Sequence, residues 1–124
     1  MIPQKIHLHK RSRELELVYP DGSRRLSCEF LRVHSPSAEV KGHGPGQDVL
    51  QVGKRQVNIT EVRPVGNYAL QFVFDDGHDS GIYSWTYLRE LTEAEDSLWA
   101  DYLKRLEAEG GSRDPDVQVL QFDP

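Results

Sequence analysis

The sequence predicts an α+β fold: a predominantly antiparallel β-sheet system of six to seven short strands, short helical turns and one long C-terminal helix. Two Asp-Gly turns, Asp21-Gly22 and Asp76-Gly77, each separate two runs of strand composition, which is typical of β-hairpins. The third observation is an apolar stripe at helical spacing, made of Leu98, Trp99, Tyr102, Leu103 and Leu106. We expect this stripe to cover the sheet.

The expected strands follow from alternating or continuous apolar residues between turn signals. They are Lys5–His9, Leu15–Tyr19, Arg24–Cys28, Val49–Val52, Gln56–Val62, Ala69–Phe74 and a return strand that holds Ile82, Tyr83 and Trp85. A short helical turn is expected at Phe30-Leu31-Arg32. Thr92-Glu93-Ala94-Glu95 matches a capping box and predicts the start of the long helix, which Gly110-Gly111 ends.

An internal similarity joins Leu15–Arg32 to Leu70–Arg89. Both run as an apolar strand, a turn that ends in Asp-Gly, a return strand and an aromatic-Leu-Arg triplet. The strands and turns match at an offset of 55 residues and the triplets at 57, so the second unit is longer by two residues. Either the two units form related halves of one sheet system, or two common hairpins resemble each other by chance.

Length and composition limit the class of protein. The 124 residues suit one domain at 1–110, followed by a flexible acidic C-terminal tail at 111–124. A net charge of −5 argues against a nucleic-acid partner, and no apolar run is long enough for a membrane span. A single cysteine, Cys28, and the lack of a secretory signal predict a cytoplasmic location. The oligomeric state is left open.

Two regions are candidates for a site. The segment Ser35–Gln47 is rich in Gly, Pro and Ser, and a loop of this length in a small domain is either mobile or functional. His78 follows the turn glycine of the central hairpin, where it serves either as a ligand or as a tie between the loop and the sheet. His43 lies between glycines, which allow close approach of backbone to a ligand or simply make the loop flexible.

Several stretches resemble a known family. The longest are Leu31–Val40, Gly42–Gln47, Pro64–Leu70 and Asp76–Trp85, the last reading Asp-Gly-His-Asp-Ser-Gly-Ile-Tyr-Ser-Trp. They resemble the gamma-butyrobetaine hydroxylase-like N-terminal domain, which in bacteria often occurs as a stand-alone protein. The resemblance covers roughly residues 4 to 107.

The resemblance implies a binding or docking role. In the family this domain precedes the oxygenase domain of carnitine-biosynthesis dioxygenases, and a similar domain follows the ATPase of some Mrp-type iron–sulfur cluster carriers. The main chemistry lies elsewhere in both settings. The chain is too short to add an oxygenase barrel, so dioxygenase activity is not carried over.

The resemblance also allows the zinc-binding residues of some family members to be compared with the residues of this chain. Eukaryotic members bind zinc through cysteines after Trp-Leu-Arg and through a later histidine. Phe30-Leu31-Arg32 matches that triplet, Ser35, Ser37 and Val40 stand at the cysteine positions, and His78 is the histidine. Hydroxyls and a valine do not replace thiolates, so that site is expected to be absent. A rebuilt site would use His78 with His34 or His43, plus Asp79 or Glu39, for zinc, iron or manganese.

We therefore expect a non-catalytic accessory module that docks onto a protein partner, in iron–sulfur or metal-cofactor metabolism. The expected partner-binding residues are His34, Ser35, Ser37, His43, Gly44, Gln47, His78 and Trp85. The alternative is a metal-binding domain that uses His78, His43, His34 and Asp79, with zinc or iron as the candidate cofactor and none required. A small enzyme of unknown reaction is the third hypothesis. No catalytic residue is predicted, because Ser80 or Ser84 with His78 and Asp79 lacks a nucleophile elbow.

Overall fold

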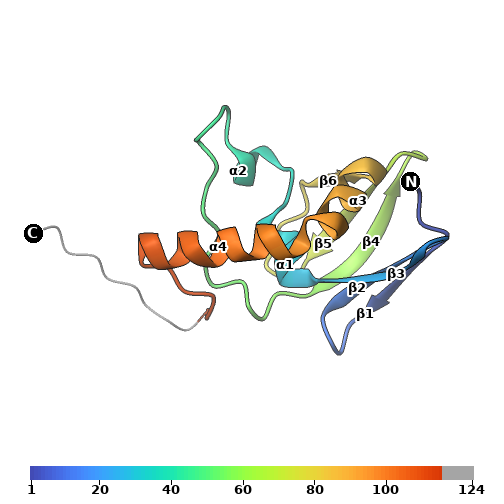
Figure 1. Ribbon diagram of the computed structural model, residues 1–124, viewed down its shortest axis with the longest axis horizontal. Helices are drawn as coiled ribbons and strands as arrows, with labels where there is room; N and C mark the ends of the chain where they lie inside the picture. Colours follow the sequence, from blue (N-terminus) through green and yellow to red (C-terminus); the bar gives the residue numbers. More distant parts are fainter. Residues whose placement is uncertain (116–124) are drawn as a thin grey trace, which may run out of the picture.

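The computed structural model describes residues 1–115 and shows, within them, two three-stranded antiparallel sheets and four helices (Figure 1). The strands are β1 Lys5–His9, β2 Glu14–Tyr19, β3 Gly22–Ser27, β4 Ile59–Val65, β5 Ala69–Phe74 and β6 Ile82–Ser84. The helices are α1 Cys28–Val33, α2 Ala38–Lys41, α3 Trp85–Glu93 and α4 Glu95–Glu109. The sheets have the orders β1-β2-β3 and β4-β5-β6, which confirms the predicted α+β class.

The two sheets belong to units with the same order of elements, three antiparallel strands followed by a helix. Strands β2 and β5 each have six residues and start 55 residues apart. Ser27 caps α1 by accepting a bond from the backbone N–H of Phe30 at 3.0 Å, and Ser84 caps α3 in the same way, from Tyr87 at 3.1 Å. The internal similarity in the sequence thus corresponds to two structural units, and β1 and β4 extend it by one strand in each.

Both units contribute to one hydrophobic core. The inward side chains alternate along β2 and β5, and the buried ones are Leu15, Leu17, Tyr19, Leu70, Phe72 and Phe74. Burying a large apolar side chain of this kind contributes about 1.5–3 kcal/mol. Tyr83 lies against Phe72 with ring centroids 4.6 Å apart and donates its hydroxyl to the carbonyl of Leu31 at 2.5 Å. This hydrogen bond joins β6 of the second unit to α1 of the first.

Two ion pairs join the units, each between the helix of one unit and the hairpin turn of the other. Arg32 on α1 donates through Nε to Asp76 Oδ2 at 2.9 Å, in the hairpin turn of the second unit. Arg89 on α3 binds both carboxylate oxygens of Asp21, in the turn of the first unit, at 3.1 and 2.6 Å. The first pair is more enclosed, with side chains 8% and 22% exposed against 16% and 43% for the second.

Residues between α2 and β4 correct two expectations. Val49–Val52 is not a strand, because Leu50 packs against the cluster of Val33, Tyr102 and Leu106 instead of pairing in a sheet. The next strand begins at Ile59 rather than Gln56 and continues through Pro64 to Val65, beyond the expected end at Val62. Proline is tolerated there because β4 is an edge strand, on which a missing N–H costs no ladder bond.

The predicted capping box at Thr92–Glu95 is also wrong. Helix α3 already runs through Thr92, whose hydroxyl donates to the carbonyl of Arg89 at 2.7 Å. Helix α4 follows after Ala94, which makes no side-chain capping bond. The Ser84 cap starts the helical region earlier than the capping box indicated. The predicted end is confirmed, since Gly110 has φ of 70°, a left-handed conformation that favours glycine.

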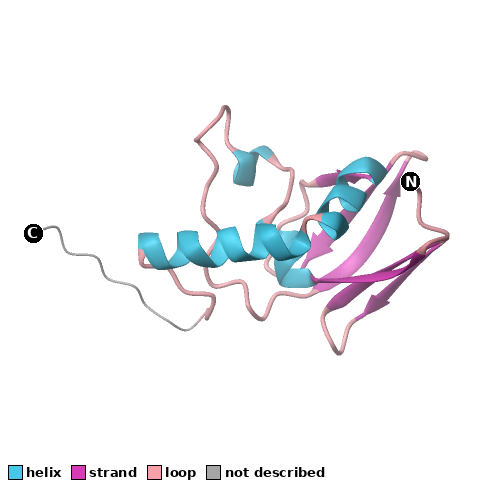
Figure 2. Cartoon of the chain, viewed as in Figure 1, coloured by secondary structure: helices cyan, strands magenta, loops and turns pink. Residues whose placement is uncertain are grey.

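Helix α4 packs against α1 more than it packs against the sheets. Tyr102 and Leu106 form a separate buried cluster with Val33, while Leu98 and Trp99 contact the main core. Leu103, which we assigned to the same stripe, is exposed. In Figures 1 and 2 the helix extends away from the sheets towards the C-terminal side of the molecule.

Part of the predicted tail lies against the body of the domain. Ser112 accepts a backbone bond from Gly53 at 2.8 Å, and Arg113 holds both carboxylate oxygens of the buried Glu29 at 2.8 and 2.7 Å. The rest of the predicted tail, 116–124, lies outside the described residues. Among helices in residues 1–115, none combines the length and apolar character needed to cross a bilayer.

We predict that Asp76→Asn lowers the free energy of unfolding by on the order of 3 kcal/mol, because it leaves the buried guanidinium of Arg32 without a compensating charge. Asp21→Asn, the matched change in the other unit, has a smaller effect because that pair is more exposed to solvent. Urea unfolding of both variants measures the difference. Equal losses would contradict the assigned ranking of the two pairs.

Candidate functional site

The segment from His34 to Val49 leaves the end of α1, forms α2 and returns (Figure 1). Ser37 begins α2 by accepting a bond from the backbone N–H of Glu39 at 3.2 Å. Val49 donates its N–H to the carbonyl of Val40 at 2.7 Å. This bond closes the segment at its base, so that its outer part forms a compact excursion. Figure 2 shows α2 as the single helical piece within this loop.

His78 is the centre of the base of this excursion. Its Nε2 lies 2.8 Å from Ser35 Oγ, and its Nδ1 lies 3.1 Å from Glu39 Oε2. A carboxylate accepts at Nδ1, which assigns the ring proton to that nitrogen and makes Nε2 the acceptor for the Ser35 hydroxyl. The imidazole is 2% exposed and the Glu39 side chain 68%. The ring therefore ties the loop to the central hairpin, one of the two roles that the sequence left open.

Neighbouring contacts strengthen the same junction. The hydroxyls of Ser37 and Ser80 lie 2.8 Å apart, and a Cβ at Gly81 would overlap Ser35 Oγ. Within the turn, Asp76 Oδ1 accepts from the backbone N–H of His78 at 3.2 Å. The enlarged turn of the second unit is thus held to the loop through several polar bonds.

Burial controls the protonation of the site. Removal from water lowers the pKa of His78 below its ordinary value of 6.5, and the Arg32 guanidinium lowers it further. The Glu39 carboxylate acts in the opposite direction and raises the pKa, but it is exposed and screened. Burial also lowers the pKa of His34, and the charge of Lys41 adds to this effect.

The structure brings together only some of the predicted partner-binding residues. Ser35 and His78 are in direct contact, and Ser37 reaches Ser80 two residues beyond His78. His43 and Gln47 are exposed on the outer part of the excursion, and Gly44 lies between them. His34 turns the other way, with Nδ1 donating to the carbonyl of Phe30 at 2.9 Å.

Trp85 lies at the opposite end of the hairpin from His78. Its indole N–H donates to the carbonyl of Asn67 at 2.8 Å, beside the turn that precedes β5. The pair Ala69 and Ser84 confirms this position, since it is the first register pair of β5 and β6. One surface therefore does not contain both Trp85 and the loop.

The residues at the implied zinc positions do not fit a zinc ion. Ser35 and His78 bond to each other, and the remaining His78 nitrogen is taken by Glu39. Within residues 1–115, no group of three or more His, Cys, Asp or Glu side chains lies close enough to hold a metal. The second predicted set, which adds His43 and Asp79, is not assembled in this part of the chain.

Ser35, His78 and Glu39 have the same order of bonds as the serine, histidine and carboxylate of a hydrolase triad. Ser35 is fully buried, however, and its oxygen also accepts from the backbone N–H of Ser37 at 3.3 Å. A substrate carbonyl has no access to that oxygen in this structure. The arrangement acts as a structural bond between segments.

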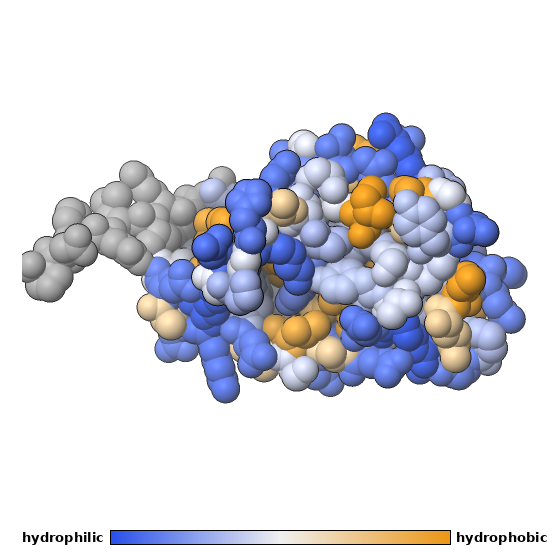
Figure 3. Space-filling view, turned by 90° about the horizontal axis from the view of Figure 1, so that it is seen from above, coloured by the Kyte–Doolittle hydropathy of each residue, from blue (hydrophilic) through white to orange (hydrophobic). Residues whose placement is uncertain are grey.

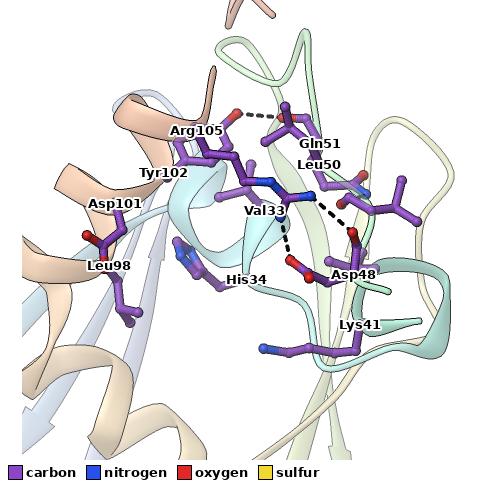
Figure 4. A pocket seen from close by; sticks show the side chains of 12 residues that line it. Val33, His34, Lys41, Asp48, Leu50, Gln51, Leu98, Asp101, Tyr102 and Arg105 are labelled. Atoms are coloured by element: carbon purple, nitrogen blue, oxygen red, sulfur yellow. Dashed lines mark hydrogen bonds and ion pairs between the residues drawn. The ribbon is translucent and has the colours of Figure 1, made fainter. Parts of the chain in front are cut away.

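Sequence reasoning missed a second feature, a cavity of about 180 Å³ between α1, α4 and the excursion (Figure 4). Arg105 on α4 spans its outer rim and pairs with Asp48, and it also donates to the Asp48 carbonyl at 3.1 Å. Tyr102 closes another side by donating its hydroxyl to the carbonyl of Gln51 at 2.7 Å. Of the residues that line the cavity, only His34 had been selected, because the others come from segments without a shared motif.

Comparison with known proteins shows the family. The profile of the family described as gamma-butyrobetaine hydroxylase-like, N-terminal, matches residues 6–89, and the chain belongs to this family. No curated protein matches the chain.

Three solved structures have the same fold. Two were determined in solution by NMR. One is 55% identical to this chain with a TM-score of 0.83, and the match covers 98% of this chain and 96% of the other. The second is 46% identical with a TM-score of 0.78, and the match covers 99% of this chain and 93% of the other. The third, a crystal structure from Acidithiobacillus ferrooxidans, is a protein of unknown function in the DUF971 family. It is 41% identical with a TM-score of 0.61, and covers 73% of this chain and 91% of its own.

We predict that an NMR titration of the His78 ring gives a pKa below 6.5, because the buried ring resists protonation. A depressed pKa contributes stability that is present above pH 6.5 and lost as the pH falls through the folded-state value. The free energy of unfolding therefore decreases on acidification, and His34 contributes in the same direction. A folded-state pKa of His78 above 6.5 would reverse the sign and contradict the burial argument.

We also predict that Gly81→Ala destabilises the protein by about 1–3 kcal/mol, because the added methyl group overlaps Ser35 Oγ at a packed junction. Gly44→Ala is the matched control, since the nearest atoms to its Cβ are 4.0 Å away. Thermal unfolding of both variants measures the effect. A tolerated Gly81→Ala would show that the loop moves freely against the hairpin.

Proposed function

We propose that the protein is a non-catalytic accessory module that acts in the cytoplasm and docks onto a protein partner through residues 38–49. The link to iron–sulfur or metal-cofactor metabolism rests on the family resemblance alone. The observation that carries the docking proposal is the contrast between the base and the outer part of the excursion.

The base of the excursion is rigid and inaccessible. Ser35, Ser37 and His78 are buried and bonded across segments, so they hold the loop and do not themselves contact a partner. The outer part carries exposed side chains, among them His43 and Gln47. A fixed base lowers the entropy cost of ordering such a loop when it binds.

The surface around the excursion suits a polar, reversible contact. Figure 3 shows this face as mainly hydrophilic, with apolar residues in separate spots rather than one continuous area. Interfaces of this character are typical of complexes that form and dissociate, in which a few residues carry most of the affinity. No specific contact among the described residues favours the metal-binding alternative, since both His78 nitrogens have protein partners.

The proposal is tested by affinity capture from the native host with the wild-type protein and the double variant His43→Ala/Gln47→Ala. We expect a protein that is retained by the wild type and lost with the variant, because the two exposed side chains lie on the proposed contact surface. Calorimetry with the purified partner should then show binding weakened by about tenfold or more.

The matched control is Lys104→Ala/Glu107→Ala, which removes two exposed side chains from α4, outside residues 38–49. This variant should keep the partner. If every captured protein binds both double variants equally, the docking surface is not the excursion and the proposal fails.

A further inference from the structure

The cavity between α1, α4 and the excursion is lined by apolar side chains and by four charged ones, Lys41, Asp48, Asp101 and Arg105 (Figure 4). Its apolar lining comes from four segments of the chain and consists of Val33, Val40, Val49, Leu50, Leu98 and Tyr102. Its volume is about 180 Å³. Since an apolar cavity of about 150 Å³ holds benzene, this one admits a ligand of about six to eight non-hydrogen atoms.

Lys41 is an exposed cation on this cavity that has no ion-pair partner among residues 1–115. Its ammonium lies 5.5 Å from the centre of the Tyr87 ring, and no carboxylate within residues 1–115 is in ion-pair distance of it. Figure 4 shows its side chain running towards His34 along the floor of the cavity. A cation with an aromatic contact but no counter-ion is a ready partner for an anionic group.

His34 lies at the same end of the cavity. Its Nδ1 is occupied by the carbonyl of Phe30, which leaves Nε2 without a hydrogen-bond partner among the described residues. Burial lowers the pKa of this ring, and the nearby charge of Lys41 lowers it further. This end of the cavity thus holds the Lys41 cation next to an imidazole nitrogen that has no partner among the described residues.

The remaining charges are either paired or lie on another wall. Arg105 is held by Asp48 and Glu109, so it is not free to bind a ligand. Asp101 lines the α4 side without a cationic partner in residues 1–115, and it would repel an anion placed beside it. A carboxylate thus fits at the Lys41 end, and an amine would fit beside Asp101.

We propose that this cavity binds a short aliphatic monocarboxylate of about five or six carbons, with its carboxylate on Lys41 and its chain against the valine and leucine side chains. The source is either a free acid or the C-terminal residue of a polypeptide, which present the same chemistry. This proposal goes beyond partner docking and stands without it.

The test is an NMR titration of the full-length ¹⁵N-labelled protein with sodium pentanoate, with pentan-1-ol and pentylamine as probes of equal length. We expect saturable shifts at residues that line the cavity in the millimolar range, which is reasonable for a ligand of about seven non-hydrogen atoms. Lys41→Met, which keeps the aliphatic stem, should weaken pentanoate binding by about tenfold. Lys104→Met, the same change on the exposed face of α4, should leave it unchanged.

A second variant separates the anion from the cation hypothesis. Asp101→Asn removes the like charge and should tighten pentanoate binding, whereas it would weaken binding of an amine. Tighter binding of pentylamine than of pentanoate, or equal affinity in Lys41→Met, overturns the proposal, as does the lack of saturable shifts. A peptide that ends in leucine, compared with its amidated form, then distinguishes a polypeptide terminus from a free acid.

Discussion

The ion pair between the buried Arg32 and the partly exposed Asp76 is the constraint on which the rest of the structure depends. Asp76 sits in the hairpin turn of the second unit, and its two oxygens receive Arg32, Lys54 and the backbone N–H of His78. This fixes three segments at one point: the helix of the first unit, the strand-free connection before β4, and the turn. Because a guanidinium without a counter-charge is costly to bury, the first helix and the second hairpin are bound to fold together.

The same turn explains why the two units differ. Their strands, serine caps and arginines correspond, but the connection between β5 and β6 (75–81) has seven residues against two (20–21) between β2 and β3, and it carries His78. The extra length lets the ring reach Ser35 and Glu39, so the chain that follows α1 is fastened to the other unit. The symmetric parts provide the core, whereas the site features lie where the symmetry is broken: the enlarged turn, the excursion and the cavity beneath it.

Local patterns were enough to predict much of the fold. Lys5–His9 and Ala69–Phe74 have the predicted bounds because alternation and an adjacent turn determine them. The helix start predicted at Thr92 was wrong because a capping motif can lie inside a helix that an earlier serine has begun. The contacts of the site were not predictable in detail: His78 finds partners 43 and 39 residues away, and no local spacing encodes that distance. The aspartates and arginines at matching offsets were visible in the sequence, yet their exchange between units depends on how the two sheets pack.

The contacts between the two units make an unbroken chain unnecessary for holding them together. The contacts Arg32–Asp76, Arg89–Asp21 and Tyr83–Leu31 all join residues on either side of the connection 42–58, from which only Val57 belongs to the main core. A backbone cut near His43 would leave three strands and their capped helix intact on each fragment. Two separately produced pieces would then have complementary faces, and could reassemble into the native domain as a split protein.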